Sequence, residues 1–270
     1  MIARSQTYTK SQVMNPIFQG VCNHFLTTRS WFWWGDKRKE SVSLPYVTSC
    51  TAMRIGPGGK AQPLHRDDYI NHNYHTEISE WDDERDARRE TAVGLMVAGS
   101  RVTKENGGTQ LIPRSHLWYV RLLLLLLLLF FGGLPTRTTI QELIEVDADP
   151  MVCRGTDRST PPDVKDCIFA DMEKGDGLIM LSSVFHGGGN NVTLDEHRLM
   201  FSTFVVRGHL RQEENQFLAV PKDVVKQYDR PTQRFIGYSI SDPACGYVEE
   251  VDPIYTLYPD ELKNVKPTDF

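Results

Sequence analysis

The apolar, strand-length segments that end at glycine-rich turns constrain the fold of this chain more than any other feature of its sequence. Tyr46–Ile55 and Thr91–Ala98 have the composition of strands, and the first leads directly into a Gly-Pro-Gly-Gly-Lys turn. Gly177–Val184 and Arg198–Val206 are predicted to form a second strand pair, separated by the turn-rich segment Gly187–Asn191. Together these segments predict a mainly β fold, a double-stranded β-helix of the jelly-roll or cupin-like type with flanking helices.

One flanking helix is predicted near the start of the chain. Residues from about Ser11 to Leu26 have apolar side chains at the i, i+3, i+4 spacing of an amphipathic helix, and Pro16 is expected to delay its start. The highly charged segment Glu77–Glu90 is expected to be a solvated helix or loop without a chemical role. With 270 residues and 40% hydrophobic content, a single domain can bury a sizeable core.

Charge and cysteine content exclude several classes of function. The net charge of -5 comes from 35 acidic and 30 basic residues scattered along the chain, which argues against nucleic acid as a partner. The five cysteines include no C-x-x-C pair, so neither a disulfide framework nor a zinc knuckle is indicated, and a cytoplasmic location is expected. The first residues lack the apolar stretch of a secretory signal. No membrane partner is expected, and a homodimer is left open.

An unbroken run of eight leucines, Leu122–Leu129, departs from this pattern. With Phe130 and Phe131 the run reaches ten apolar residues, whereas a membrane-spanning helix needs about 20. It shows neither the alternation of a half-buried strand nor the polar face of an amphipathic helix. The run is therefore either a buried core element or a segment foreign to the fold.

Three side chains are candidate metal ligands. His65 and Asp67 stand two residues apart, so on an extended strand both side chains lie on one face. This pair alone is a weak signal, because the H-x-D spacing often arises by chance. His186 follows an apolar strand, where a side chain can point into a cavity mouth; the alternative is a surface turn residue. Two imidazoles and one carboxylate form the facial triad of iron(II) oxygenases, which leaves three positions open for a chelating co-substrate and O₂.

A buried arginine is expected near these ligands. The returning strand places Arg198, Met200, Ser202 and Phe204 alternately along one face. If that face lines the barrel, the guanidinium needs an anion, and a planar carboxylate satisfies it through two hydrogen bonds. The far carboxylate of 2-oxoglutarate is the candidate anion; the alternative is a surface arginine paired with Asp195 or Glu196.

An ordered set of motifs resembles the phytanoyl-CoA dioxygenase superfamily and, within it, fungal secondary-metabolite oxygenases such as those of quinolone and meroterpenoid pathways. The likeness extends from about residue 10 to 118 and from about 155 to 260. The motifs are, in chain order, Q-x-x-H-x-D from Gln62 to Asp67, N-G-G-T-Q-L-I-P-R-S-H from Asn106 to His116, H-G-G-G-N-N from His186 to Asn191, and Arg198.

The resemblance implies a role for each matching residue. The three candidate ligands match the family's iron ligands, and Arg198 matches its anchor for the distal carboxylate of 2-oxoglutarate. Gln62 and Thr109 match further hydrogen-bond donors to this co-substrate, although both can also be ordinary turn and strand residues. His116 is interpreted as structural.

The resemblance also implies the reaction, the oxidative decarboxylation of 2-oxoglutarate to succinate coupled to oxidation of an unactivated carbon. Because Asp67 occupies the position that a halide would need, hydroxylation, desaturation, epoxidation or rearrangement is favoured over halogenation. The implied substrate is a small-molecule natural product such as an alkaloid or meroterpenoid.

The chain departs from the family pattern in two places. Family members usually begin some tens of residues earlier, so we expect a single dioxygenase domain over residues 1–270 that lacks part of its barrel. Residues 119–154 match nothing in the family, whereas the likeness continues if Trp118 is joined to Gly155, which predicts a foreign insert from a retained intron or a mis-spliced gene model. Two other functions stay open: an inactive or degraded family member, and a cupin-like metal isomerase or hydrolase without 2-oxoglutarate, against which Arg198 argues.

Overall fold

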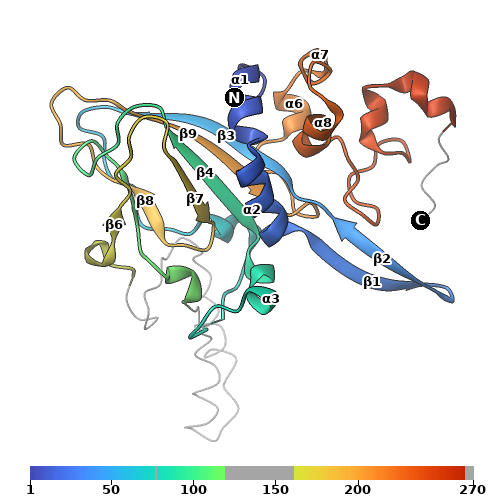
Figure 1. Cartoon of the computed structure of the whole chain (residues 1–270), viewed down its shortest axis with the longest axis horizontal. Helices are drawn as coiled ribbons and strands as arrows, with labels where there is room; N and C mark the ends of the chain where they lie inside the picture. The colour runs from blue at the N-terminus through green and yellow to red at the C-terminus, as the bar shows by residue number, and fades with distance from the viewer. Residues whose placement is uncertain (77, 119–160, 265–270) are drawn as a thin grey trace, which may run out of the picture.

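A computed structural model describes residues 1–76, 78–118 and 161–264 (Figure 1). The strands are β1 (Thr28–Trp34), β2 (Lys37–Ser43), β3 (Tyr46–Ile55), β4 (Ala92–Ala98), β5 (Thr109–Leu111), β6 (Ile168–Phe169), β7 (Gly177–Leu181), β8 (His186–Gly188) and β9 (Arg198–Val206). The α-helices are α1 (Gln6–Tyr8), α2 (Pro16–Leu26), α3 (Asp83–Asp86), α6 (Gln216–Ala219), α7 (Lys222–Val225) and α8 (Arg230–Ile236). Short 3-10 or π turns are η1 (Thr9–Val13), η2 (Asp67–Asn71), η3 (Ala87–Arg89), η4 (Ser115–Leu117), η5 (Val164–Asp166), η6 (Pro253–Thr256) and η7 (Pro259–Asn264).

Two antiparallel sheets form the body of the described structure. One has four strands in the order β3-β9-β4-β7, and the other has three in the order β6-β5-β8. On the outer face of the larger sheet, Leu95 and Val205 pack in the cluster that contains the buried side of α2. Its inner face carries a cluster that includes Met96 and Met200, and Thr109 on β5 lies 4.0 Å from the Met96 sulfur. The inner faces of the two sheets therefore meet.

This arrangement confirms the predicted fold class, mainly β with flanking helices, although the ladders among the described residues do not close into a barrel. The predicted N-terminal helix is present and begins at Pro16. Asn15 caps it, because its side chain accepts hydrogen bonds from the backbone N–H groups of Ile17 and Phe18. The preceding residues Thr9–Val13 form the π turn η1 instead of a continuous α-helix.

The predicted pairing of the two C-terminal strands is wrong. β4 lies between β7 and β9 and is hydrogen-bonded to both. β7 also ends at Leu181, and the predicted turn begins with a strand, since Gly187 and Gly188 belong to β8. The chain between β7 and β9 thus crosses to the smaller sheet, where β8 pairs with β5, and this crossover prevents the two flanking strands from forming a hairpin.

A hairpin that the sequence analysis did not predict, β1–β2, projects away from the two sheets (Figure 1). It exposes Trp31, Trp33 and Trp34. The guanidinium of Arg38 lies over the Trp31 ring at 4.7 Å, and the Lys39 ammonium lies 5.4 Å from the centroid of Trp34. These cation–π contacts partly cover aromatic side chains that have no other core to enter.

Residues 119–160 lie outside the described residues, and with them the leucine run and the predicted insert. None of the described helices has the length and apolar character needed to cross a membrane.

Candidate metal centre

An antiparallel bridge between two distant segments brings the histidines together. The backbone N–H of His65 donates to the His186 carbonyl at 2.9 Å, and the reverse bond is also 2.9 Å long. The two imidazole centroids are 4.7 Å apart. Asp67 follows on the same side, because Arg66 between them is extended, with φ -107° and ψ 139°. The predicted face shared by residues i and i+2 is therefore present.

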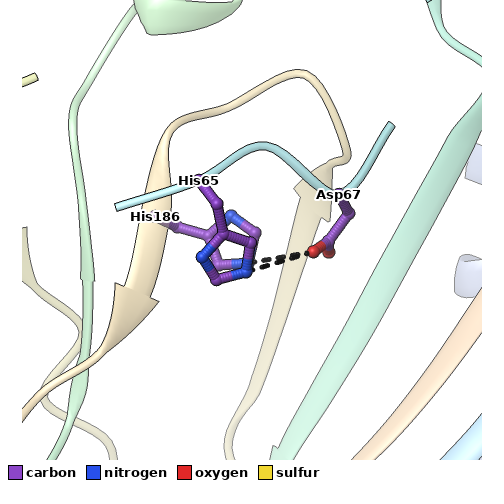
Figure 2. Close-up of side chains that lie close together, drawn as sticks. All are labelled: His65, Asp67 and His186. Atoms are coloured by element: carbon purple, nitrogen blue, oxygen red, sulfur yellow. Dashed lines mark ion pairs between the residues drawn. The ribbon is translucent and has the colours of Figure 1, made fainter. Parts of the chain in front are cut away.

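The three side chains converge on one point (Figure 2). Asp67 Oδ1 is 3.5 Å from Nε2 of His65 and 3.5 Å from Nε2 of His186. Among the described residues, this is the group of histidine, cysteine and acidic side chains whose ligand atoms lie close enough to hold one ion, all within 4.8 Å of one another. Neighbouring ligands at about 2 Å from an octahedral metal lie about 3 Å apart, so a small contraction would complete a facial site.

Backbone carbonyls orient both imidazoles for metal binding. His65 Nδ1 is 2.7 Å from the Pro63 carbonyl, and His186 Nδ1 is 3.0 Å from the Val184 carbonyl. A carbonyl can only accept, so each Nδ1 donates its hydrogen, and the neutral ring presents the Nε2 lone pair to the centre. Burial lowers the pKa of His186, which favours this neutral form. For His65, by contrast, the carboxylate of Asp67 accepts a hydrogen bond from the ring and so raises its pKa.

The acidic ligand has an unsatisfied atom. Asp67 Oδ2 is buried and has no hydrogen-bond partner, which is rare for a carboxylate oxygen unless a metal or its water accounts for it. Two neutral imidazoles and one carboxylate are the donor set of non-heme iron(II) sites. The residues present therefore fit an iron(II) ion.

The three predicted co-substrate residues converge two positions further along β8. A side chain added to Gly188 would place its Cβ 3.1 Å from Gln62 Oε1 and 3.4 Å from Arg198 Nη2. Gly188 lies two residues after His186 on the same strand face, and it pairs with Thr109. Glycine here leaves room for both polar side chains beside the metal-binding group.

Arg198 is buried, as expected, with 2% of its surface exposed. Its Nε and Nη2 donate to the Gly107 carbonyl at 3.0 and 2.8 Å, instead of forming the alternative surface pair with Asp195 or Glu196. Burial lowers the pKa of the guanidinium. Among the described residues it has no carboxylate partner, so the positive charge is balanced only by a carbonyl dipole.

Gln62 and Thr109 are placed differently from one another. Gln62 Oε1 accepts from the Gly188 N–H at 2.8 Å, which orients the amide, and the residue is exposed. Thr109 is buried, with 4% exposure. Both lie beside Gly188. Among the described residues no hydrogen bond joins their two side chains.

A cavity of about 200 Å³ opens beside His65 and Asp67. Its walls include Tyr69, Phe204 and Glu213, which the sequence analysis did not single out as functional. Phe204 could have been identified, because it shares the strand face of Arg198. No local sequence pattern indicates a functional role for Glu213. A larger cleft of about 850 Å³, between the base of the β1–β2 hairpin and α8, contains none of the three ligands.

The profile of the family described as "Phytanoyl-CoA dioxygenase (PhyH)" matches residues 3–199. The chain belongs to the phytanoyl-CoA dioxygenase family. It is similar to the dioxygenase peniF of Penicillium patulum, with 32% identity over 250 residues, 93% of this chain and 68% of the relative. It is also similar to the dioxygenase cnsJ of Penicillium expansum, with 32% identity over 261 residues, 96% of this chain and 67% of the relative. The chain thus spans about two thirds of each relative's length. The solved structure of EctD from S. alaskensis in its apoform matches 62% of this chain and 47% of its own, at 16% identity and a TM-score of 0.38.

These comparisons confirm the predicted family and the predicted class of enzyme, a PhyH-type dioxygenase. Behind its candidate ligands, this dioxygenase has a buried polar network. His75 Nε2 lies 2.6 Å from Asp68 Oδ2, and both side chains are 2% exposed; Asn73 donates to the same oxygen at 2.9 Å. Ser183 donates to Glu90 at 2.6 Å. The first group holds the turn that carries the acidic ligand, and the second holds the turn before the last histidine.

Proposed function

We propose that this PhyH-type dioxygenase uses iron(II), 2-oxoglutarate and O₂ to oxidise a small-molecule natural product, a fungal secondary metabolite such as an alkaloid or meroterpenoid. The outcome is hydroxylation, desaturation, epoxidation or rearrangement. The metal ligands are His65, Asp67 and His186, and the described residues form one catalytic domain. The organisms of the relatives, both Penicillium species, support the fungal setting.

One observation carries the proposal. The Nε2 atoms of both histidines lie 3.5 Å from the same carboxylate oxygen, and both Nδ1 atoms are held by carbonyls of their own segments. An ordinary buried ion pair would have one histidine at hydrogen-bond distance and would not need two rings with their lone pairs aimed at one point.

When bound by these three residues, iron(II) would supply the redox chemistry for O₂ activation and decarboxylation of the co-substrate. The protein supplies position and charge. Arg198 binds the distal carboxylate of 2-oxoglutarate, because a buried guanidinium presents two parallel N–H groups to a planar anion. Gln62 and Thr109 donate further hydrogen bonds to this co-substrate from either side of Gly188.

Anaerobic titration of the purified protein with iron(II) and then 2-oxoglutarate tests the proposal. A weak visible metal-to-ligand charge-transfer band should appear only when both are present, and His186→Ala should abolish it. Iron binding without the band would favour a cupin-like metal enzyme that does not use 2-oxoglutarate. A band without substrate-stimulated succinate formation, across a panel of natural products, would favour an inactive family member.

A further inference from the structure

The cavity beside the candidate iron ligands has an acidic lining. About 200 Å³ is enough for a ring with a short side chain and too little for a whole natural product, so it holds one end of the substrate. Among the described residues that line it there is no lysine or arginine. In the proposed function the carboxylate of Asp67 would bind the metal, which leaves Glu213 as the acidic side chain that a substrate would meet.

A β-bulge directs Glu213 into this cavity. The register between β3 and β9 shifts between Val47 and Ser49, so Thr48 has no partner in the ladder. Its free groups bind the loop after β9 instead: the Thr48 hydroxyl accepts from the Glu213 N–H at 2.6 Å, and its carbonyl accepts from the Glu214 N–H at 3.0 Å. Ser49 then donates to Glu213 Oε2 at 2.7 Å. Three hydrogen bonds from one strand thus position Glu213: two hold the backbone of Glu213 and Glu214, and one reaches the carboxylate.

No cation in the described part of the chain balances the Glu213 carboxylate. Among the described residues Glu213 forms no ion pair, and its second oxygen, Oε1, has no hydrogen-bond partner within the same set. Phe204 and Tyr69 add two aromatic rings to the wall, whose faces attract positive charge. Phe204 is fixed because its ring packs where Gly94 has no side chain, only 2.9 Å from the position of a Cβ at that glycine.

The cavity that contains Glu213 and the site proposed for 2-oxoglutarate lie at opposite ends of the inner face of β9. Arg198 begins the strand and Phe204 lies six residues later on the same face, which at about 3.4 Å per residue is roughly 20 Å. A positively charged residue stands at the end proposed for a dicarboxylate, and a carboxylate stands at the end that remains for the substrate. The two ends therefore select ligands of opposite charge.

We propose that Glu213 binds a protonated amine of the substrate, so that this dioxygenase acts on a basic, nitrogen-containing compound and not on a neutral terpenoid. This inference rests on the proposed function for the identity of the site. The amine donates to Glu213 Oε1 while an adjacent apolar group packs on Phe204 and Tyr69. Because His65 and Asp67 line the same cavity as Glu213, binding the amine there would also fix which carbon faces the metal.

Calorimetric binding of two small probes tests the inference. The probes are 2-phenylethylamine, which is protonated at neutral pH, and 2-phenylethanol, its neutral counterpart of nearly the same size. They are titrated anaerobically into protein loaded with iron(II) and 2-oxoglutarate. The amine should bind at least about fivefold more tightly, which corresponds to one partly screened ion pair. Glu213→Gln should reduce the preference to within about twofold, while the band formed by iron and 2-oxoglutarate stays unchanged.

Glu214→Gln is the matched control, because it removes the same charge one residue away, where the carboxylate accepts from Gln216 instead of entering the cavity. It should keep the preference for the amine. Equal affinities in the parent protein, no binding of either probe, or a preference that survives in Glu213→Gln would overturn the inference; the last result would mean that the amine binds iron directly. The two proposals fail separately, since a missing charge-transfer band contradicts the proposed function, while the effect of Glu213→Gln on probe binding to the iron-loaded protein still decides the inference.

Discussion

Glu90 should make the stability of this protein depend on pH, and Glu90→Gln should remove that dependence. The side chain is 1% exposed. Ser183 donates to its Oε1 at 2.6 Å, whereas Oε2 is buried without a partner. Burial raises the pKa of this carboxyl from 4.5 to about 7, and the hydrogen bond from Ser183 opposes that rise only in part.

The direction of the effect follows from the raised pKa. The folded protein holds the proton more tightly than the unfolded chain, so the contribution to stability is complete below pH 4.5 and is lost as the pH rises through about 7. One pKa unit corresponds to about 1.4 kcal/mol. The free energy of unfolding should therefore fall by about 3 kcal/mol over this window, of which about 2 kcal/mol or somewhat more lies between pH 5 and pH 8.

Urea unfolding of metal-free protein at pH 5 and pH 8 measures the effect. Other titrating groups cancel when the parent is compared with Glu90→Gln at each pH. The unpaired amide of the glutamine costs about 1–3 kcal/mol at both values, so the variant should be less stable at pH 5 and should regain about 2 kcal/mol on the parent by pH 8. Glu105→Gln, at an exposed glutamate, is the control and should show no such change. A stability difference between the parent and Glu90→Gln that is the same at both pH values would refute the reasoning.

Four further predictions concern the site and the insert. Alanine at any one of the proposed metal ligands, which are His65, Asp67 and His186, should abolish iron-dependent turnover and lower iron stoichiometry after desalting. Full activity of a variant would remove that residue from the centre. Arg198→Lys should keep iron binding yet raise the apparent requirement for 2-oxoglutarate about tenfold, because an ammonium cannot make the two-pronged contact; an unchanged requirement would place the anchor elsewhere. Gly188→Ala should weaken 2-oxoglutarate binding, since its Cβ would lie 3.1 Å from Gln62 Oε1, whereas Gly20→Ala, with nothing within 4 Å, should not; equal binding in both would contradict the crowding. Deleting residues 119–154 should raise soluble yield without loss of iron, and a deletion variant that fails to fold while the full chain binds iron would make the leucine run a core element.

Much of the candidate site could be predicted because its geometry is local. The spacing of His65 and Asp67 needs only an extended residue between them, and Arg66 is extended. The alternation that starts at Arg198 likewise needs only a regular strand, and β9 is regular from its first residue. Local periodicity is what a single sequence carries most reliably.

Long-range order could not be predicted in the same way. The sequences of β7 and β9 do not indicate that β4 lies between them. The order of strands in a sheet depends on contacts between distant segments, which local patterns do not report. The β1–β2 hairpin was missed for another reason: both of its faces are largely exposed, so the alternation of polar and apolar residues is absent. A signal was nevertheless present, since Gly35-Asp36 is a typical two-residue turn and Gly35 has φ +62°.

The glycines after His186 explain both why a turn was wrongly predicted there and why the site beside them was predicted in part. Gly187 and Gly188 predict a turn, because glycine in a strand gives up the packing of a side chain. Here that loss allows a close approach that no other residue permits: a Cβ on Gly187 would lie 3.0 Å from the Gln62 carbonyl, and one on Gly188 would meet Gln62 and Arg198. The bridge between the two histidines needs the first approach, and the pocket proposed for 2-oxoglutarate needs the second. Gly187 and Gly188 therefore mislead a secondary-structure prediction, which considers only the strand itself. Their presence is explained by the segments that pack against the strand, Gln62 and Arg198.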